Sequence, residues 1–455
     1  MPTVVNKVVK YSGGDYTSIP AALAAVPANL VTADQQWNIL IDESAAGVYE
    51  WDLGNYGVTI SGITTDATRY IRIAPNTGKG FKDNVSKITN ALRYNAANGI
   101  ALKTTGIRVF EVGVGSMVFE GLQMYAPNVF NSFNGLLTCL GGGAGATVKD
   151  CILQSARTDT ARAVAGMVGG SVINSLIITS GAHGIALSGA GTARNVTVVN
   201  VGSAGTSVAI YSDFSASTIK NTAAFGFSAV LGGGITSLDA ASSNNATDLG
   251  SGPTNWGTGS LVSRTYANQF QSITGGSEDF RVKAGADLIN AGTPDATYTS
   301  NLDIVGSARS LTTPTIGAWE FPSITYTYAR PSSDVTTQWT PSTAGPHYAL
   351  INETTPNDAN YIYATAAAQT DEVGLQAMST PTAGTDVLVN YRVQGITGGG
   401  SVTVSLYTGA TLVKADTTRT ANNTSPAYYT MTVTAAEWGA VAVNWSNMRL
   451  RFVSA

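Results

Sequence analysis

The sequence has few charged residues and no strong excess of either sign. Only 12% of its 455 residues are Asp, Glu, Lys or Arg, and the formal net charge is −4. Because proteins that bind nucleic acid or anionic membranes use basic patches, neither partner is expected. No apolar run reaches the roughly 18 residues of a membrane-spanning helix, and the N-terminus lacks the apolar core of a signal peptide. We therefore expect synthesis in a cytoplasm, without a signal peptide and without membrane insertion.

Cysteine and histidine are scarce as well. Cys139 and Cys151 are the only cysteines, and we expect a free buried pair rather than a disulfide. Of the two histidines, His183 follows Gly181-Ala182 and is expected on the surface of a turn rather than as a general base. His347 has no histidine or cysteine beside it in the sequence, so no zinc site is predicted.

A short phrase with an Asp or Asn at its centre recurs four times. The centres are Asp150, Asn174, Asn195 and Asn221, with spacings of 174 − 150 = 24, 195 − 174 = 21 and 221 − 195 = 26 residues. Such spacings lie in the range of roughly 20 to 50 residues that marks stacked repeats. β-Branched and apolar residues flank each centre, and clusters of Gly, Ser and Ala separate the units. The repeats predict a parallel β-helix with three short strands in each coil.

Each central Asp or Asn is expected at a corner between two strands. These residue types tolerate the left-handed backbone region, and their side chains can bond the copy in the next coil. The alternative is that the four residues lie in unrelated turns. The residue before each centre is Lys149, Ile173, Arg194 or Lys220. Stacking would bring the three cations onto one outer edge, most simply as a solvated face, with a groove for an acidic glycan as the alternative.

The chain divides into three regions. Residues 1–45 are predicted to form an N-terminal cap with a strand, a short helix and a second strand. Residues 46–321 alternate short strands with glycine-rich turns. After a linker at Pro322-Ser323, residues 324–455 show the period-two alternation of an antiparallel β-sandwich, either jelly-roll or immunoglobulin-like. The expected fold class is all-β, with a right-handed parallel β-helix followed by an antiparallel β-sandwich.

Three segments resemble known families. The phrase GGDYTSIPAALAAVP (residues 13–27) is similar to the opening of pectin methylesterase and pectate lyase-like β-helix proteins. Residues 279–321 resemble the closing segment of many bacterial and phage β-helix proteins, which implies that the β-helix ends near residue 321. Residues 330–452 resemble a domain that recurs in virion proteins of tailed phages.

No catalytic site is predicted in the β-helix. Polysaccharide cleavage requires two carboxylates around the scissile bond, or a base with a cation. Asp42 and Glu43 are expected on opposite faces of a strand, whereas Glu50 and Asp52 share a face, for which a solvated strand end is the simpler interpretation. The Asp motifs of the methylesterases and the Asp cluster and Arg-Pro-x-x-Arg phrase of the lyases are missing. The other candidate acids are Glu111, Glu120, Asp150, Asp159 and Asp213.

The C-terminal region offers only general candidates for binding. Its acids Asp334, Glu353, Asp358 and Asp371 could hold calcium through loop oxygens, but no spacing of residues supports such a site, and neither a metal nor another cofactor is predicted. Aromatic residues could stack on sugars, although most are expected in the core. These aromatic residues are Trp339, Tyr348, Tyr361, Tyr363, Tyr391, Tyr407, Trp438 and Trp445.

The resemblances and the low charge imply a non-enzymatic structural component of a tailed-phage virion. A spike, a fibre or a capsid-surface decoration would fit. The protein is then expected in the virion, as a homotrimer that contacts other virion proteins. Host surface polysaccharide is a candidate ligand. Two alternatives stay open: a tailspike depolymerase that cuts capsule or lipopolysaccharide, and a glycan-binding sandwich on a β-helical stalk.

Overall fold

A computed structural model describes most of the chain as two compact units, Met1–Ser323 and Ile324–Ala455, and each unit is described by itself. The described residues are 1–455 except 107, 128–134, 140–144, 157–162, 182, 189–190, 204, 213–216, 234–236, 296–300, 323–327, 354–356, 382–385, 396–399 and 421–425.

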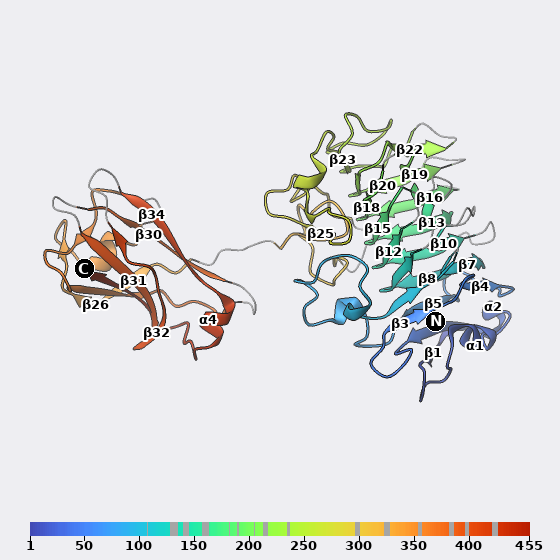
Figure 1. The fold of residues 1–455 in the computed structure, drawn as a ribbon, viewed down its shortest axis with the longest axis horizontal. Coiled ribbons are helices and arrows are strands. Elements are labelled where there is room, and N and C mark those ends of the chain that lie inside the picture. Colours follow the sequence, from blue (N-terminus) through green and yellow to red (C-terminus); the bar gives the residue numbers. More distant parts are fainter. Residues whose placement is uncertain are drawn as a thin grey trace. The chain divides into compact units, whose positions relative to one another are not determined.

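Three parallel sheets form the first unit (Figure 1). Sheet 1 contains β1 (Thr3–Val9), β2 (Gln35–Ile41), β5 (Ile71–Pro75), β8 (Met117–Glu120), β11 (Thr147–Lys149), β14 (Ser171–Ile173), β17 (Thr192–Arg194) and β20 (Thr218–Lys220). Sheet 2 contains β3 (Glu50–Asp52), β6 (Ala101–Lys103), β9 (Gln123–Ala126), β12 (Ile152–Ser155), β15 (Leu176–Thr179), β18 (Thr197–Asn200), β21 (Ala223–Phe225) and β23 (Ala246–Thr247). Sheet 3 contains β4 (Val58–Ser61), β7 (Phe110–Gly113), β10 (Leu137–Cys139), β13 (Ala163–Val168), β16 (His183–Ser188), β19 (Val208–Ser212) and β22 (Ala229–Gly233).

From β2 to β22 the chain visits the three sheets in turn, so each of these coils adds one strand to every sheet. Alternate side chains point inward and fill the core between the sheets, among them Phe110, Phe119 and Ile177. This arrangement is a parallel β-helix, as the repeats predict.

The N-terminal residues are continuous with the coils. β1 pairs in parallel register with β2, and β2 pairs with β5, so both strands of the expected cap belong to sheet 1. Helix α1 (Ile19–Ala24) starts at Ser18, whose Oγ accepts a hydrogen bond from the Ala21 N–H at 3.3 Å. It buries Ile19 and Leu23 in the core of the β-helix. The short helix α2 (Leu30–Ala33) follows and leads into β2.

Both faces of sheet 2 are buried over much of its length. Outward residues such as Leu176, Val199 and Phe225 belong to a second apolar cluster. Two segments cover them: the cover loop (residues 81–98), which contains η1 (Phe81–Asp83) and η2 (Ala96–Asn98), and the closing segment (residues 270–321), which contains β24 (Phe270–Ser272) and β25 (Asp279–Val282) and follows η3 (Tyr266–Asn268). The cover loop and the closing segment are joined where Phe280 N–H donates to the Leu92 carbonyl at 3.2 Å.

The second unit consists of antiparallel strands. Its main sheet has the order β26 (Pro331–Thr337), β29 (Thr370–Leu375), β35 (Met448–Ser454), β31 (Ser401–Thr408) and β32 (Thr411–Ala415), with β33 (Arg419–Thr420) also paired to β31. The remaining elements are the β30–β34 pair (Val387–Val393 and Ala427–Val433), the β27–β28 pair (Thr340–Pro341 and Ile362–Tyr363), α3 (His347–Leu350) and α4 (Ala435–Gly439).

Side chains from the main sheet and from the β30–β34 pair share one apolar core. Val373, Val404 and Leu450 come from the main sheet, and Val389 and Met431 come from the pair. Two antiparallel layers around a common core make a β-sandwich, so the predicted all-β fold class is confirmed for both units.

Candidate functional site

The repeated Asp and Asn residues lie at the corner between sheets 1 and 2. Asp150, Asn174, Asn195 and Asn221 have φ angles of 54°, 48°, 53° and 49°, the left-handed conformation expected of them. All four are buried. The Nδ2 group of Asn174 donates to Asp150 Oδ1 at 2.7 Å, and that of Asn221 donates to Asn195 Oδ1 at 2.9 Å. The predicted side-chain ladder is confirmed at these two steps.

The closing segment binds to this corner ladder. Arg309 is buried, and its Nη2 group donates to Asn174 Oδ1 at 2.7 Å and to the Ala318 carbonyl at 2.7 Å. The Arg309 Nη1 group lies 3.3 Å from Glu320 Oε2. Asn221 also accepts a hydrogen bond from the Thr293 N–H at 2.9 Å. The ladder therefore holds the closing segment as well as its own coils.

Glu50 and Asp52, the candidate acid pair, have different surroundings on β3. Glu50 Oε2 accepts from the Tyr94 hydroxyl at 2.7 Å, and its Oε1 lies 3.5 Å from Lys103 Nζ. The Tyr94 ring stacks on Tyr125, with 4.8 Å between centroids. Asp52 is exposed and accepts from the N–H of Gly54 in its own turn at 2.8 Å. Glu50 thus fixes the cover loop, and Asp52 stabilises a turn.

Asp42 and Glu43 converge, contrary to the expectation from the sequence. β2 ends at Ile41, so strand alternation no longer applies to the next two residues. Lys79 Nζ lies 3.7 Å from Asp42 Oδ1 and 3.0 Å from Glu43 Oε1. Lys10 Nζ lies 4.0 Å from Asp42 Oδ1 and 3.8 Å from Glu43 Oε2. The two acids and the two lysines form a compact, charge-balanced cluster.

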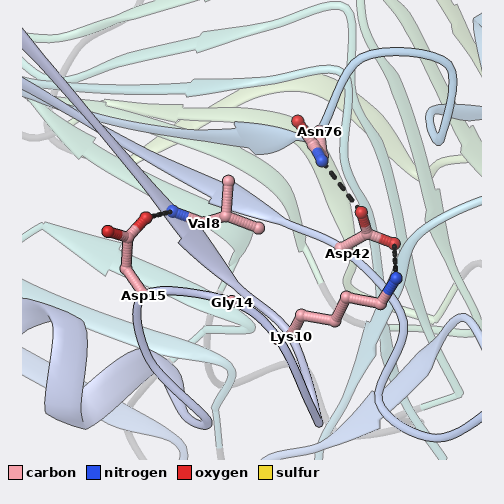
Figure 2. Close-up of a pocket in the computed structure, with 7 residues that line it drawn as sticks. Val8, Lys10, Gly14, Asp15, Asp42 and Asn76 are labelled. Atoms are coloured by element: carbon pink, nitrogen blue, oxygen red, sulfur yellow. Dashed lines mark hydrogen bonds and ion pairs between the residues drawn. The ribbon is translucent and has the colours of Figure 1, made fainter.

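This cluster borders a shallow hollow beside β1, which Figure 2 shows. The hollow is lined by Val8, Lys10, Gly13, Gly14, Asp15, Asp42 and Asn76. Burial raises the pKa of Asp42, but the Asn76 amide, the Glu43 N–H and the two lysines lower it more, so the pKa lies below its usual value. Asp15 accepts from the Val8 N–H at 2.8 Å, and its pKa is lowered by that bond and by Lys7. Both acids are therefore ionised and unsuited to act as a general acid near neutral pH.

The remaining acid candidates also have partners. Glu120 lies 2.7 Å from Arg72 Nε and within 4 Å of Lys82 and Lys149. Burial raises the pKa of Glu120, but these cations lower it below its usual value. Asp150 belongs to the corner ladder, and Glu111 forms an ion pair with Arg108. Asp159 and Asp213 lie outside the described residues.

The cations before the repeat centres align as predicted. The strand register places Lys149, Ile173, Arg194 and Lys220 at matching positions of β11, β14, β17 and β20. Arg194 Nη1 lies 2.7 Å from Asp295 Oδ2, and Lys149 Nζ lies 3.5 Å from Glu120 Oε1. Two of the three cations are therefore ion-paired within the protein, which reduces the positive charge that this column presents.

Cys139 and Cys151 are buried thiols that are not joined in a disulfide, as expected from the sequence. Burial raises the pKa of both thiols to about 12. His183 differs from its prediction, because it begins strand β16 instead of lying in a turn. Its Nδ1 accepts from the Val208 N–H at 3.0 Å, and its ring stacks on Tyr211 at 5.3 Å. These contacts between neighbouring coils give His183 a structural role.

His347 has a partner that its sequence neighbours do not reveal. Its Nδ1 lies 2.7 Å from Asp371 Oδ2, and both residues are buried. Asp334 accepts from the His347 N–H at 3.0 Å and from the Tyr348 N–H at 2.7 Å. Burial outweighs the contact with His347 and raises the pKa of Asp371. The contact joins α3 to β29. Asp371 lies 24 residues after His347 in the chain, so the residues next to His347 could not reveal this partner.

The other calcium candidates lie apart from this pair. Glu353 accepts from the Asn357 N–H at 2.8 Å, and Asp358 forms an ion pair with Arg392 at 2.6 Å. Within the described residues, no group of three His, Cys, Asp or Glu side chains could hold a metal ion. In the same residues, no helix has the length and apolar character needed to cross a bilayer.

Most aromatic candidates of the second unit contribute to its core, as expected. Trp445 is buried in the apolar core. Four other candidates are partly buried and pack against this core: Trp339, Tyr348, Tyr391 and Trp438. Tyr361 is 47% exposed, and Tyr407 lies beneath Arg451, whose guanidinium carbon is 4.1 Å from the ring centroid.

Tyr428, which was not among the candidates, is 66% exposed. The alternation of β34 would have identified it, because Met431 and Val433 point inward and residue 428 therefore points outward.

Comparison with known protein families finds no family model that matches the chain. A search of the curated proteins likewise finds no relative.

Proposed function

We propose that this protein is a non-enzymatic structural component of a tailed-phage virion, acting as a spike, a fibre or a capsid-surface decoration. The observation that carries the proposal is the fastening of the β-helix by its own closing segment, through Arg309 and the corner ladder. Sheet 2 is buried on both faces, and Arg309 binds the corner beside it. We expect such a β-helix to be rigid, which suits a protein exposed on the surface of a particle. The resemblance of residues 279–321 and 330–452 to phage proteins supplies the virion assignment.

The state of the acids supports a role without catalysis. A glycosidase needs one carboxylate held protonated and a second one ionised on the other side of the bond. Asp42, Glu43 and Glu120 have lowered pKa values and cationic partners. Asp303 has its pKa raised to about 6 by burial, but it is enclosed and accepts N–H groups from Val305, Ser307 and Glu320. Each described candidate acid is thus used to hold the fold.

Two experiments test the proposal. Immunogold electron microscopy of intact phage particles with an antibody against this chain should label one defined position on the particle. Labelling that is absent from purified particles but present in the lysate would refute the virion assignment. Incubation with host capsule and lipopolysaccharide should release neither reducing ends nor unsaturated uronates. Release that Glu50→Gln or Asp52→Asn abolishes would establish the depolymerase alternative instead.

Self-assembly belongs to the same proposal. Homotrimers are expected because flat parallel sheets can pack side by side about a threefold axis. Sheet 2 is not available for such packing, because the closing segment and the cover loop cover its outer face. Light scattering of the purified chain should give the mass of a trimer, and a monomeric mass at high concentration would remove this part of the proposal.

A further inference from the structure

The β30–β34 pair presents one exposed face of defined composition in the second unit. Alternate residues point away from the core in register, with Leu388 opposite Thr432, Asn390 opposite Thr430 and Arg392 opposite Tyr428. We call these six residues the ribbon face. Five of the six are exposed, and Arg392 is partly so. Their inward neighbours Val389 and Met431 are buried in the sandwich core, so the ribbon face has a rigid base.

Tyr428 is held in place although it is 66% exposed. The guanidinium carbon of Arg392 lies 4.4 Å from the Tyr428 ring centroid, within the distance of a cation–π contact. Arg392 is fixed in turn by Asp358, with Nη1 2.6 Å from Oδ1 and Nη2 3.2 Å from Oδ2. The two-point ion pair orients the guanidinium plane, and the guanidinium supports the ring. An exposed aromatic ring that is fixed before binding loses little conformational entropy when a ligand stacks on it.

Polar groups lie beside the ring at the spacing of one strand pair. Thr430 Oγ1 donates to Asn390 Oδ1 at 2.7 Å, which occupies the amide oxygen and leaves the Asn390 Nδ2 donors for a ligand. Asp358 is exposed and adds carboxylate acceptors next to Arg392. The ribbon face, together with Asp358 beside it, therefore combines one aromatic surface with both hydrogen-bond donors and acceptors.

We propose that the ribbon face binds a neutral saccharide. The apolar face of a pyranose ring packs on an aromatic ring, while its hydroxyl groups require neighbouring donors and acceptors. A neutral ligand is favoured because Arg392 and Asp358 balance each other's charge, so that the face has no net attraction for a polyanion. A protein partner is disfavoured, since Leu388 and Tyr428 are the only large apolar residues that the face exposes, too few for the apolar centre of an interface.

This inference deepens the proposed function, because it names the host-surface chemistry that the virion component would contact. The test uses the full-length chain on a printed array of bacterial surface polysaccharides. It is followed by titration with two neutral oligosaccharides, maltohexaose and chitohexaose, and with the acidic polymer polygalacturonate. Tyr428→Ala is the test variant. Tyr361→Ala is the matched control, because it also removes an exposed tyrosine from the same unit but lies outside the ribbon face.

The expected result is binding to neutral glycans that Tyr428→Ala weakens by about tenfold or more. Tyr361→Ala should bind as the unmodified chain does, and Arg392→Met, which removes the support of the ring, should fall between the two. Absence of binding to every neutral glycan, equal loss in both tyrosine variants, or selective binding of polygalacturonate would each overturn the inference. Particle labelling is measured separately, so failure of the virion assignment would leave a positive binding result intact.

Discussion

Arg309 donates a hydrogen bond of 2.7 Å to the amide oxygen of Asn174, although the two residues are 135 positions apart. The bond connects the closing segment to the corner of a coil near the middle of the β-helix. Because Asn174 also donates to Asp150, one residue links two coils and the segment that covers them. The coils of the β-helix are therefore held together by the closing segment as well as by the hydrogen bonds between their strands.

Arg309→Leu should destabilise the first unit strongly. The change leaves Glu320 as a buried carboxylate without its ion-pair partner, and breaking such a pair costs about 3 to 5 kcal/mol. Arg264→Leu is the matched control, since its ion pair with Asp287 is exposed and such pairs contribute up to about 1 kcal/mol. Urea unfolding of the full-length variants measures both. Equal stability of the two variants would contradict the fastening role of Arg309.

The corner ladder can be separated into its backbone and side-chain parts. Asn195→Ala should cost about 1 to 3 kcal/mol, because it leaves the Nδ2 donor of Asn221 without this acceptor and puts alanine, which tolerates the left-handed region less well than asparagine, at a φ of 53°. Asn195→Gly removes the same hydrogen bond, but glycine adopts positive φ without strain. Thermal denaturation should therefore give the highest melting temperature for the unmodified chain, a lower one for Asn195→Gly and the lowest for Asn195→Ala. A melting temperature that neither variant changes would remove the ladder as a source of stability.

The sequence predicts the repeated part of the fold best, because the period of the repeat is written in local residue types. Asp150 and its three counterparts mark corners that need a left-handed residue. The same corner is occupied by Gly121, with a φ of 69°, and by Asn244, with a φ of 52°, in coils whose flanking residues obscure the phrase. Local pattern is thus sufficient to predict the corners of the four regular coils and insufficient for the coils on either side of them.

Contacts between distant segments could not be predicted in the same way. Arg309 carries no local signal that it is buried against Asn174, since its neighbours Ala308 and Ser310 do not mark it as a core position. His347 and Asp371 meet only because α3 packs on β29. Asp42 and Glu43 were predicted to diverge because strand alternation was extended beyond Ile41, where the strand has already ended. In each of these cases the tertiary arrangement decides the pairing.

Glu437 should titrate well below an ordinary glutamate. Lys414 lies 2.7 Å from its Oε1, and this contact and the Thr434 N–H lower its pKa to about 2 from 4.5. A lowered folded-state pKa contributes stability above the unfolded value, and the contribution is lost as pH falls from about 4.5 to about 2. Carboxyl NMR titration should find the low midpoint in the native chain and a higher one in Lys414→Met. An unchanged midpoint in that variant would show that Lys414 is not the cause.

The two thiols should be unreactive in the folded protein. Cys139 and Cys151 are buried, and burial raises the pKa of each thiol to about 12, so the reactive thiolate is scarce at neutral pH. Ellman's reagent should therefore detect no thiol in the native chain and both thiols in denaturant. Cys139→Ser and Cys151→Ser assign the signal to each position. Rapid reaction in native buffer would show that the core of the β-helix opens readily.

The second unit is predicted to fold by itself. It has its own apolar core, which includes Val404 and Leu450, and its sheet pairings stay within residues 331–454. Residues 324–455 expressed alone should therefore give a β-type circular dichroism spectrum and one cooperative thermal transition. Val404→Ala tests the result, because loss of a fully buried side chain from the shared core should lower the transition temperature by several degrees, whereas Thr432→Ala on the exposed ribbon face should leave it nearly unchanged. A fragment without a cooperative transition would mean that this core needs the β-helix, and equal effects of the two substitutions would mean that the sandwich is not packed around Val404.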